Sequence, residues 1–181
     1  GDGHLTVYYA GSAPQVPANG RLMVFCSSRD MFTLPLIFHT NFKLSQGQNE
    51  WILLADAGGN VLDDFQLSDR TKENHSRGRT TDGAATWSLF QTPTPNAANV
   101  GASADYEPKP QFSLPAGVYA GAQSVALSSP SGATIRYTLD GTTPTATSTP
   151  YAAPLNIAAT TVVRAACFSA TPGVPPSFIE T

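Results

Sequence analysis

A strand pattern that runs directly into a rigid turn constrains the fold of this chain more than any other feature. Ile135, Tyr137 and Leu139 alternate with polar residues, and a period of two places them on one face of a half-buried strand. Asp140-Gly141 follows at once; Asp accepts hydrogen bonds from the next backbone amides, and Gly readily adopts a positive φ. We therefore predict that the strand ends in a turn and that Asp140 makes this turn rather than serving as a ligand or an acid.

The same punctuation recurs along the whole chain. Its 181 residues include 15 Gly and 15 Pro, 41% of them are hydrophobic and 13% are charged. Short apolar runs are separated by turn residues, and no long window repeats with the 3.6-residue period of a helix. The pattern predicts an all-β protein with two β domains.

Strands joined by short turns are predicted throughout the first half. Residues 51–55 and 60–65 flank a Gly-rich turn and indicate a β-hairpin. Residues 78–80 and 87–90 flank Asp-Gly and indicate a second one, and 21–26 reads as a further strand.

A change of composition divides the chain. Residues 100–110 lack periodicity and are rich in small residues and Pro, which indicates a linker. After it charged residues become sparse, Ser, Thr, Ala and Pro dominate, and further strands are expected at 124–128 and 161–168. We therefore place the two domains at 1–99 and 111–181.

The second domain carries five blocks of residues in a fixed order: Gly117-Val118-Tyr119 with Val125 and Leu127, then 133–138, 140–145, 148–151 and 163–165. In these blocks it resembles the chitobiase/β-hexosaminidase C-terminal domain, a small immunoglobulin-like module. The resemblance implies an accessory domain without catalytic residues, found in secreted bacterial multidomain proteins and often attached to glycan-processing enzymes.

The first hundred residues contain another set of blocks, at 17–25, 39–45, 59–63, 76–79 and 92–99, with Asp82-Gly83 and Trp87 between the last two. Here the chain resembles the lamin tail domain, an immunoglobulin-like sandwich of exported bacterial proteins and nuclear lamins. Together the two resemblances imply two immunoglobulin-like β-sandwich domains in tandem.

The lamin tail resemblance also implies an incomplete domain, because the strands that usually open that family are not found before Leu5. We expect the chain to be a fragment of a longer protein. An unpaired sheet edge would then pair with a strand of a neighbouring domain or of a second copy, which predicts self-association.

Charge and hydropathy exclude two classes of partner. A formal net charge of −3 argues against a nucleic-acid binder, and no apolar run is long enough for a membrane span. The one basic cluster is interspersed with Asp69 and Glu73, which favours a solvated loop over anion or nucleic-acid binding. Its members are Arg70, Lys72, His75, Arg77 and Arg79.

Catalytic and metal-binding patterns are absent from the sequence. There is no G-x-S-x-G elbow, and no His-x-His, Cys-x-x-Cys or calcium-loop spacing. The candidates with the best chemistry are His4, His39 and His75 for catalysis, and Asp56, Asp63 and Asp64 for calcium. Strand, loop and hairpin positions explain them better. We therefore predict no catalytic residue, no metal, no cofactor and no enzymatic activity.

Two cysteines, Cys26 and Cys167, lie in strand-like runs, one in each proposed domain. A disulfide framework is therefore not expected. Buried free thiols are favoured, with a bridge or a reactive thiol as the alternatives.

Two sets of residues are candidates for contacts with partners. Tyr119 and Tyr151 lie next to turns and are the aromatic rings expected to be exposed together, as glycan contacts. The apolar residues of a Pro-containing segment either pack over the sandwich or form an interface with a neighbouring domain or subunit. They are Met31, Phe32, Leu34, Leu36, Ile37 and Phe38.

The sequence thus predicts non-catalytic structural or interaction modules of a bacterial multidomain protein that is secreted or exposed at the cell surface. Expected partners are neighbouring domains of the same protein and a cell-surface protein or glycan. Two alternatives stay open: a carbohydrate-binding accessory region of a glycan-processing enzyme, and a fragment of a larger enzyme whose catalytic domain lies outside the chain.

Overall fold

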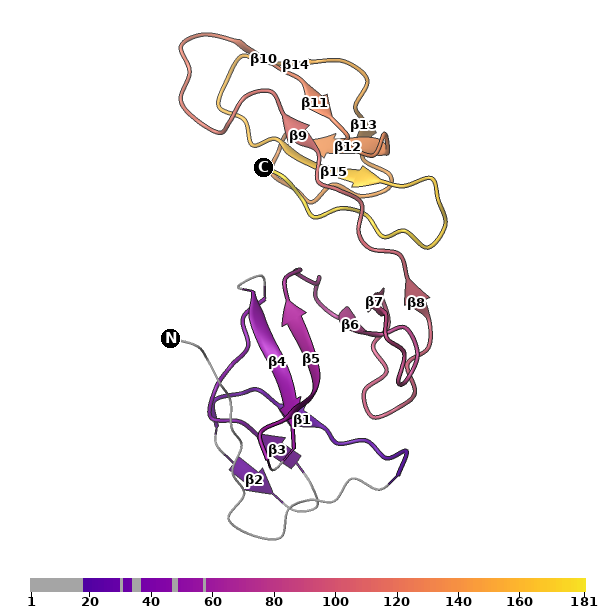
Figure 1. The fold of residues 1–181 in the computed structure, drawn as a ribbon. Coiled ribbons are helices and arrows are strands. Elements are labelled where there is room, and N and C mark those ends of the chain that lie inside the picture. Colours follow the sequence, from indigo (N-terminus) through magenta and orange to yellow (C-terminus); the bar gives the residue numbers. More distant parts are fainter. Residues whose placement is uncertain (1–17, 30, 34–36, 47–48, 57) are drawn as a thin grey trace. The chain divides into compact units, whose positions relative to one another are not determined.

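The computed structural model describes residues 18–29, 31–33, 37–46, 49–56 and 58–181. These residues form β-strands and no helix (Figure 1). The expected all-β fold is therefore confirmed for the described part of the chain. By its internal contacts the chain divides into two compact units, Gly1–Gly101 and Ala102–Thr181. Their identity as two sandwich domains in tandem stays a prediction.

The described part of the first unit begins with a small mixed sheet of three strands in the order β1-β3-β2. β1 (Val24–Phe25) pairs parallel with β3 (Ile37–His39), and β3 pairs antiparallel with β2 (Met31–Thr33). The strand predicted at 21–26 is reduced to β1. The bounds of β1 depend on pairing with residues 14 positions further along the chain, Val24 with Phe38 and Phe25 with His39, which the local pattern does not reveal.

The hairpin predicted around the Gly-rich turn is confirmed as β4 (Glu50–Ala55) and β5 (Val61–Leu67). Asp56 Oδ1 accepts hydrogen bonds from the backbone N–H groups of Gly58 and Asn60, each at 2.9 Å. Gly59 takes a φ of 84°, which a residue with a Cβ adopts at a cost. The turn chemistry read from the sequence therefore forms this hairpin.

The second predicted hairpin is also present, as β6 (Ser76–Arg79) and β7 (Trp87–Phe90). Trp87 stacks on Phe65 of β5, with ring centroids 3.6 Å apart. The Arg79 guanidinium lies over the Trp87 ring, 5.3 Å from its centroid. It also forms an ion pair with Asp63 of β5. An aromatic stack and a cation therefore hold the two hairpins together.

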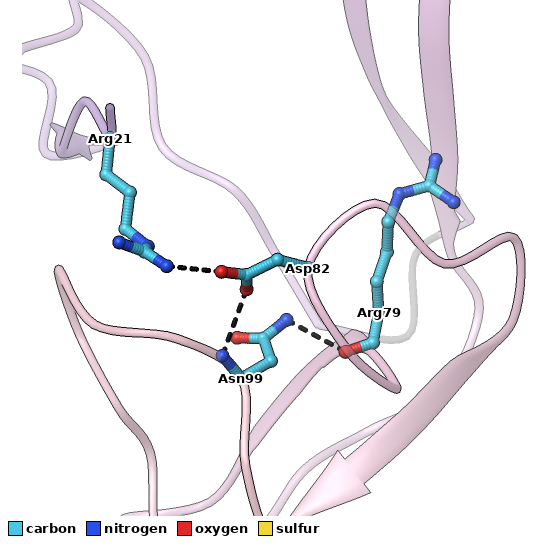
Figure 2. A network of polar contacts seen from close by, with 4 residues as sticks. All are labelled: Arg21, Arg79, Asp82 and Asn99. Carbon is cyan, nitrogen blue, oxygen red and sulfur yellow. Dashed lines mark hydrogen bonds and ion pairs between the residues drawn. The ribbon is translucent and has the colours of Figure 1, made fainter. Parts of the chain in front are cut away.

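A polar network closes the first unit (Figure 2). Asp82 forms an ion pair with Arg21 and accepts the backbone N–H of Asn99 at 3.0 Å. The Asn99 side-chain amide donates to the backbone carbonyl of Arg79 at 2.8 Å. Hydrogen bonding from Asn99, then from Arg21, holds the pKa of Asp82 below its usual value. The Asp-Gly turn between β6 and β7 therefore anchors both ends of this unit's described chain.

Eight short strands follow β7 along the chain. They are β8 (Ala102–Ser103), β9 (Gln111–Phe112), β10 (Gln123–Val125), β11 (Leu127–Ser128), β12 (Thr134–Thr138), β13 (Thr149–Pro150), β14 (Leu155–Ile157) and β15 (Arg164–Phe168). The central sheet has the order β13-β12-β15, and two antiparallel pairs, β9–β11 and β10–β14, accompany it (Figure 1). The buried core of the second unit is formed by Val125, Leu127, Ile135, Leu155, Ala165 and Cys167.

The strand predicted before the Asp-Gly turn is β12, but its apolar alternation ends one residue early. Ile135 is buried and Tyr137 half-buried, whereas Leu139 is 46% exposed. Asp140 Oδ1 accepts the backbone N–H of Thr142 at 3.0 Å, as expected for a turn residue. The prediction for Leu139 was wrong because β12 ends at Thr138 and the turn begins there.

The strand predicted at 124–128 divides between two partners. β10 pairs with β14 and β11 with β9. At the junction Ala126 donates its N–H to Ser113 Oγ and accepts the N–H of Ser113, both at 2.9 Å. A side-chain hydroxyl thus replaces one ladder acceptor where the chain changes partner.

Part of the predicted linker belongs to the second unit. Glu107 donates its N–H to the Pro175 carbonyl at 3.0 Å, and Tyr106 meets Phe178 edge-on with centroids 5.0 Å apart. Small-residue composition indicated a linker, and within it Tyr106 and Glu107 contact residues near the end of the chain. The predicted domain bounds stay a prediction.

The final residues of the chain extend the central sheet beyond β15. Ala165 and Glu180 exchange two backbone hydrogen bonds of 2.9 Å. Ser177 donates its N–H to the Cys167 carbonyl at 3.0 Å, and its Oγ accepts the Cys167 N–H at 2.9 Å. The edge of β15 that faces away from β12 is therefore hydrogen-bonded at Ala165 and at Cys167.

Candidate functional site: a groove in the second unit

A groove of about 1220 Å³ lies in the second unit. One wall is the loop between β9 and β10, and the other is the segment between β14 and β15. Phe112, Val125 and Ile157, from β9, β10 and β14, contribute to the lining. The paired strands therefore supply the apolar base, and the two connections supply the sides.

Tyr119 is the aromatic ring of the β9–β10 wall and is 41% exposed. Its hydroxyl donates a hydrogen bond of 2.7 Å to the Pro115 carbonyl. Gly117 lies beside the ring, since a Cβ there would meet Tyr119 Cε2 at 3.5 Å. The Gln123 side-chain amide donates to the Ala120 carbonyl at 3.3 Å. The loop's own contacts therefore fix the ring while leaving part of it open to solvent.

Charge is balanced along the groove. The charged side chains among its lining residues are Lys109 and Glu180, and they form an ion pair with each other. Hydroxyls, the Gln123 amide and backbone carbonyls supply the remaining polarity. The side chains that line the groove therefore carry no net charge and offer no strong field to an ionic ligand.

The two tyrosines predicted as glycan contacts are not brought together in this groove. Tyr151 is absent from its lining, and its ring packs half-buried against the core, edge-on to Tyr137 with centroids 6.5 Å apart. Its backbone N–H donates to the Ile135 carbonyl at 2.8 Å. This backbone bond directs Tyr151 onto the core, whereas Tyr119 lies in the groove. Glycan contact itself stays a prediction.

The apolar segment predicted as an interface is only partly described. Phe38 is buried in the first unit. Met31 and Phe32 lie in β2 and Ile37 in β3, while Leu34 and Leu36 lie outside the described residues. Phe38 therefore packs within the unit, and an interface through the segment stays a prediction.

The histidines do not form a catalytic group in the described residues. His39 Nδ1 shares a 2.8 Å hydrogen bond with Ser27 Oγ, and its ring stacks on Phe25. Burial, then the charge of Lys72, lowers the pKa of His75. His4 lies outside the described residues.

Acidic side chains proposed for calcium have structural partners instead. Asp56 forms its turn, and hydrogen bonding by the Asn60 side chain is the main cause that lowers its pKa. Asp63 is held by Arg79, which lowers the pKa of that carboxyl. Among the described residues, no three of His, Cys, Asp and Glu gather closely enough to hold a metal ion.

The basic cluster is likewise engaged within the first unit. Arg79 is bound by Asp63 and Trp87, and its Nη1 donates to the Ala84 carbonyl at 2.5 Å. Burial lowers the pKa of Lys72. Arg77 and Arg79 lie half-buried in β6, so the prediction of a solvated loop was wrong for these two residues. The absence of nucleic-acid binding stays a prediction.

Both cysteines are unbridged, Cys26 half-buried and Cys167 buried. Burial raises the pKa of each thiol above its usual value. Since the thiolate is the reactive form, neither environment activates its cysteine.

Comparison with known proteins finds a family model that matches part of the second unit. The family model of the Chitobiase/beta-hexosaminidase C-terminal domain matches residues 114–177. The match begins in the β9–β10 wall of the groove and runs through β15, so it includes Tyr119 and all six buried core residues named above. This half of the sequence prediction is confirmed.

No curated protein and no solved structure matches the chain. The lamin tail resemblance of the first half therefore stays a prediction. Across the ranges that the structure describes, no helix is long and apolar enough to cross a membrane.

Proposed function

We propose that this chain is a non-catalytic accessory part of an exported bacterial multidomain protein that processes glycans. The family match over residues 114–177 carries this proposal, because the family is named after the C-terminal domain of two glycan-processing enzymes. In this reading the second unit acts as an attached module that positions a catalytic domain lying elsewhere in the protein.

The polar side chains of the second unit support a structural role. Arg136 donates to the Ser148 carbonyl at 2.6 Å, and Arg164 donates to the Gly141 carbonyl at 3.0 Å. Asp140 is used by its own turn. These charged side chains are therefore engaged in holding turns against strands.

For the first unit we propose a lamin-tail-like sandwich that serves as a spacer or presentation module. Its exposed apolar side chains on the β4–β5 hairpin, Trp51, Leu54, Val61 and Leu62 among them, support contact with a neighbouring domain. We place the whole protein outside the cell or at its surface, as the resemblances of both halves imply.

Sequencing the complete reading frame tests this function most directly. We expect a glycan-processing catalytic domain in the same protein. Removing residues 102–181 from that protein should lower its activity on an insoluble polymeric glycan while leaving activity on a short soluble substrate unchanged.

Two results would contradict the proposal. One is a complete frame that encodes no glycan-processing domain. The other is hydrolysis of an aryl N-acetylglucosaminide by the 181-residue chain alone, at a rate above that of heat-denatured protein.

A further inference from the structure

We propose that the groove beside Tyr119 binds a neutral oligosaccharide several sugar rings long. This inference rests on the proposed function and deepens it, since it assigns ligand binding to one surface of the second unit. Size, charge and surface chemistry each favour this ligand.

The size of the groove selects an extended ligand. Pockets for compact small molecules measure roughly 300–1,000 Å³, and this groove measures about 1220 Å³ between two loops. A single sugar would leave most of the apolar base in contact with water. A chain of several rings lying along the groove would cover it.

Charge favours a neutral ligand. Lys109 and Glu180 neutralise each other at the groove, and no other lining side chain is charged. A sulfated or uronic-acid chain would lose hydration on binding and gain no opposing charge in return. A neutral polyol loses much less.

The remaining surface combines a flat ring with hydrogen-bonding groups. Because Tyr119 uses its hydroxyl on Pro115, the ring is held in place and its open part is available to the C–H face of a sugar. Gln123 uses its side-chain N–H on the loop, and its carbonyl oxygen has no partner among the described residues. Thr161 Oγ1 donates to the Ala159 carbonyl and retains the capacity to accept. Sugars offer both an apolar face and hydroxyl donors.

Titration of the 181-residue chain with a tetrasaccharide of β-linked N-acetylglucosamine, followed by amide NMR, tests the assignment. We expect saturable shifts at Tyr119, Gln123 and Thr161. Tyr119→Ala should weaken binding roughly tenfold, as for loss of a central aromatic contact. Tyr119→Phe keeps the ring and should restore binding to within about threefold, which separates stacking from loop disruption.

Control measurements distinguish the groove from general stickiness. Leu139→Ala removes an exposed apolar side chain outside the groove and should leave the affinity unchanged. A sulfated tetrasaccharide should bind at least about tenfold more weakly. Shifts located elsewhere, equal binding of the sulfated chain, or unchanged affinity of Tyr119→Ala would each overturn the proposal. So would the absence of binding by this and other neutral β-linked tetrasaccharides at millimolar concentration. The accessory function would survive any of these results, because the reading frame tests it independently.

Discussion

The variant Ser177→Ala tests how much a buried side-chain hydrogen bond stabilises the second unit. Ser177 is 1% exposed. Ser177 Oγ accepts the backbone N–H of Cys167 at 2.9 Å and donates to the Phe178 carbonyl at 2.7 Å. Ser177→Ala removes the acceptor and leaves the Cys167 N–H buried without a partner.

The expected cost follows from burial. An unsatisfied buried donor costs about 1–3 kcal/mol. For a unit of this size, each kcal/mol lowers Tm by about 4–8 °C, so the melting temperature of the second unit should fall by roughly 4–24 °C. Relaxation that admits a water molecule would bring the loss toward the lower end.

Ser113 provides a matched control. Its Oγ also accepts a backbone N–H at 2.9 Å, from Ala126, but this serine is exposed. Water can replace the hydroxyl in Ser113→Ala, so the loss should stay below about 1 kcal/mol. Both variants remove an acceptor of one backbone N–H, one in a buried and one in an exposed place, and Ser177→Ala also removes the hydrogen bond to the Phe178 carbonyl.

Hydrogen exchange of the full chain is the appropriate assay, because two units need not unfold as one transition. Slow amides of β12 and β15 report on the second unit alone. If Ser177→Ala and Ser113→Ala reduced their protection equally, burial would not be the deciding factor and the reasoning would fail.

Three further predictions concern acid stability, thiol reactivity and association. Hydrogen bonds from the Thr142 hydroxyl and N–H lower the pKa of Asp140 from its usual value. The contribution of this carboxylate to stability is therefore present above about pH 4 and is lost as the pH falls through the lowered pKa of the folded protein. In Asp140→Asn the free energy of unfolding, measured by urea denaturation at a series of pH values, should therefore fall less steeply below about pH 4 than in the parent chain. Equal slopes for the two proteins would contradict this. Cys26 and Cys167 should react with a thiol reagent at pH 7 far more slowly in native than in urea-unfolded protein; equal rates would refute the raised pKa values. Light scattering should show concentration-dependent association that Leu62→Lys, at a position 65% exposed on the β4–β5 hairpin, reduces; a strictly monomeric parent chain would exclude it.

Local chemistry made the hairpins predictable from sequence. The β4–β5 turn needs an acceptor at Asp56 and a positive φ at Gly59, and both requirements are visible in four consecutive residues. Leu139 shows where this reasoning ends. The alternation of apolar and polar residues continues through Leu139. The strand nevertheless stops at Thr138, because Asp140 forms a bridge with Val162, more than twenty residues further along the chain.

The candidate site was less accessible to sequence reasoning. Tyr119 and Tyr151 both lie beside turns, and only the pairing of Tyr151 with Ile135 distinguishes a core position from a groove position. Gln123 and Thr161 carry no motif, and they share a groove because β10 pairs with β14. Such juxtaposition depends on which strands meet, and composition or period does not encode it.

The partner change at Ala126 restricts how this sequence can vary in length. Residues before it are registered on β14 and residues after it on β9, so an insertion or deletion inside 123–128 would turn the side chains of one pair to the opposite face while the other pair kept its register. Val125 and Leu127 could not then both remain in the core. Related sequences should therefore accept many substitutions along this run but keep its length constant, placing their insertions in the loops on either side.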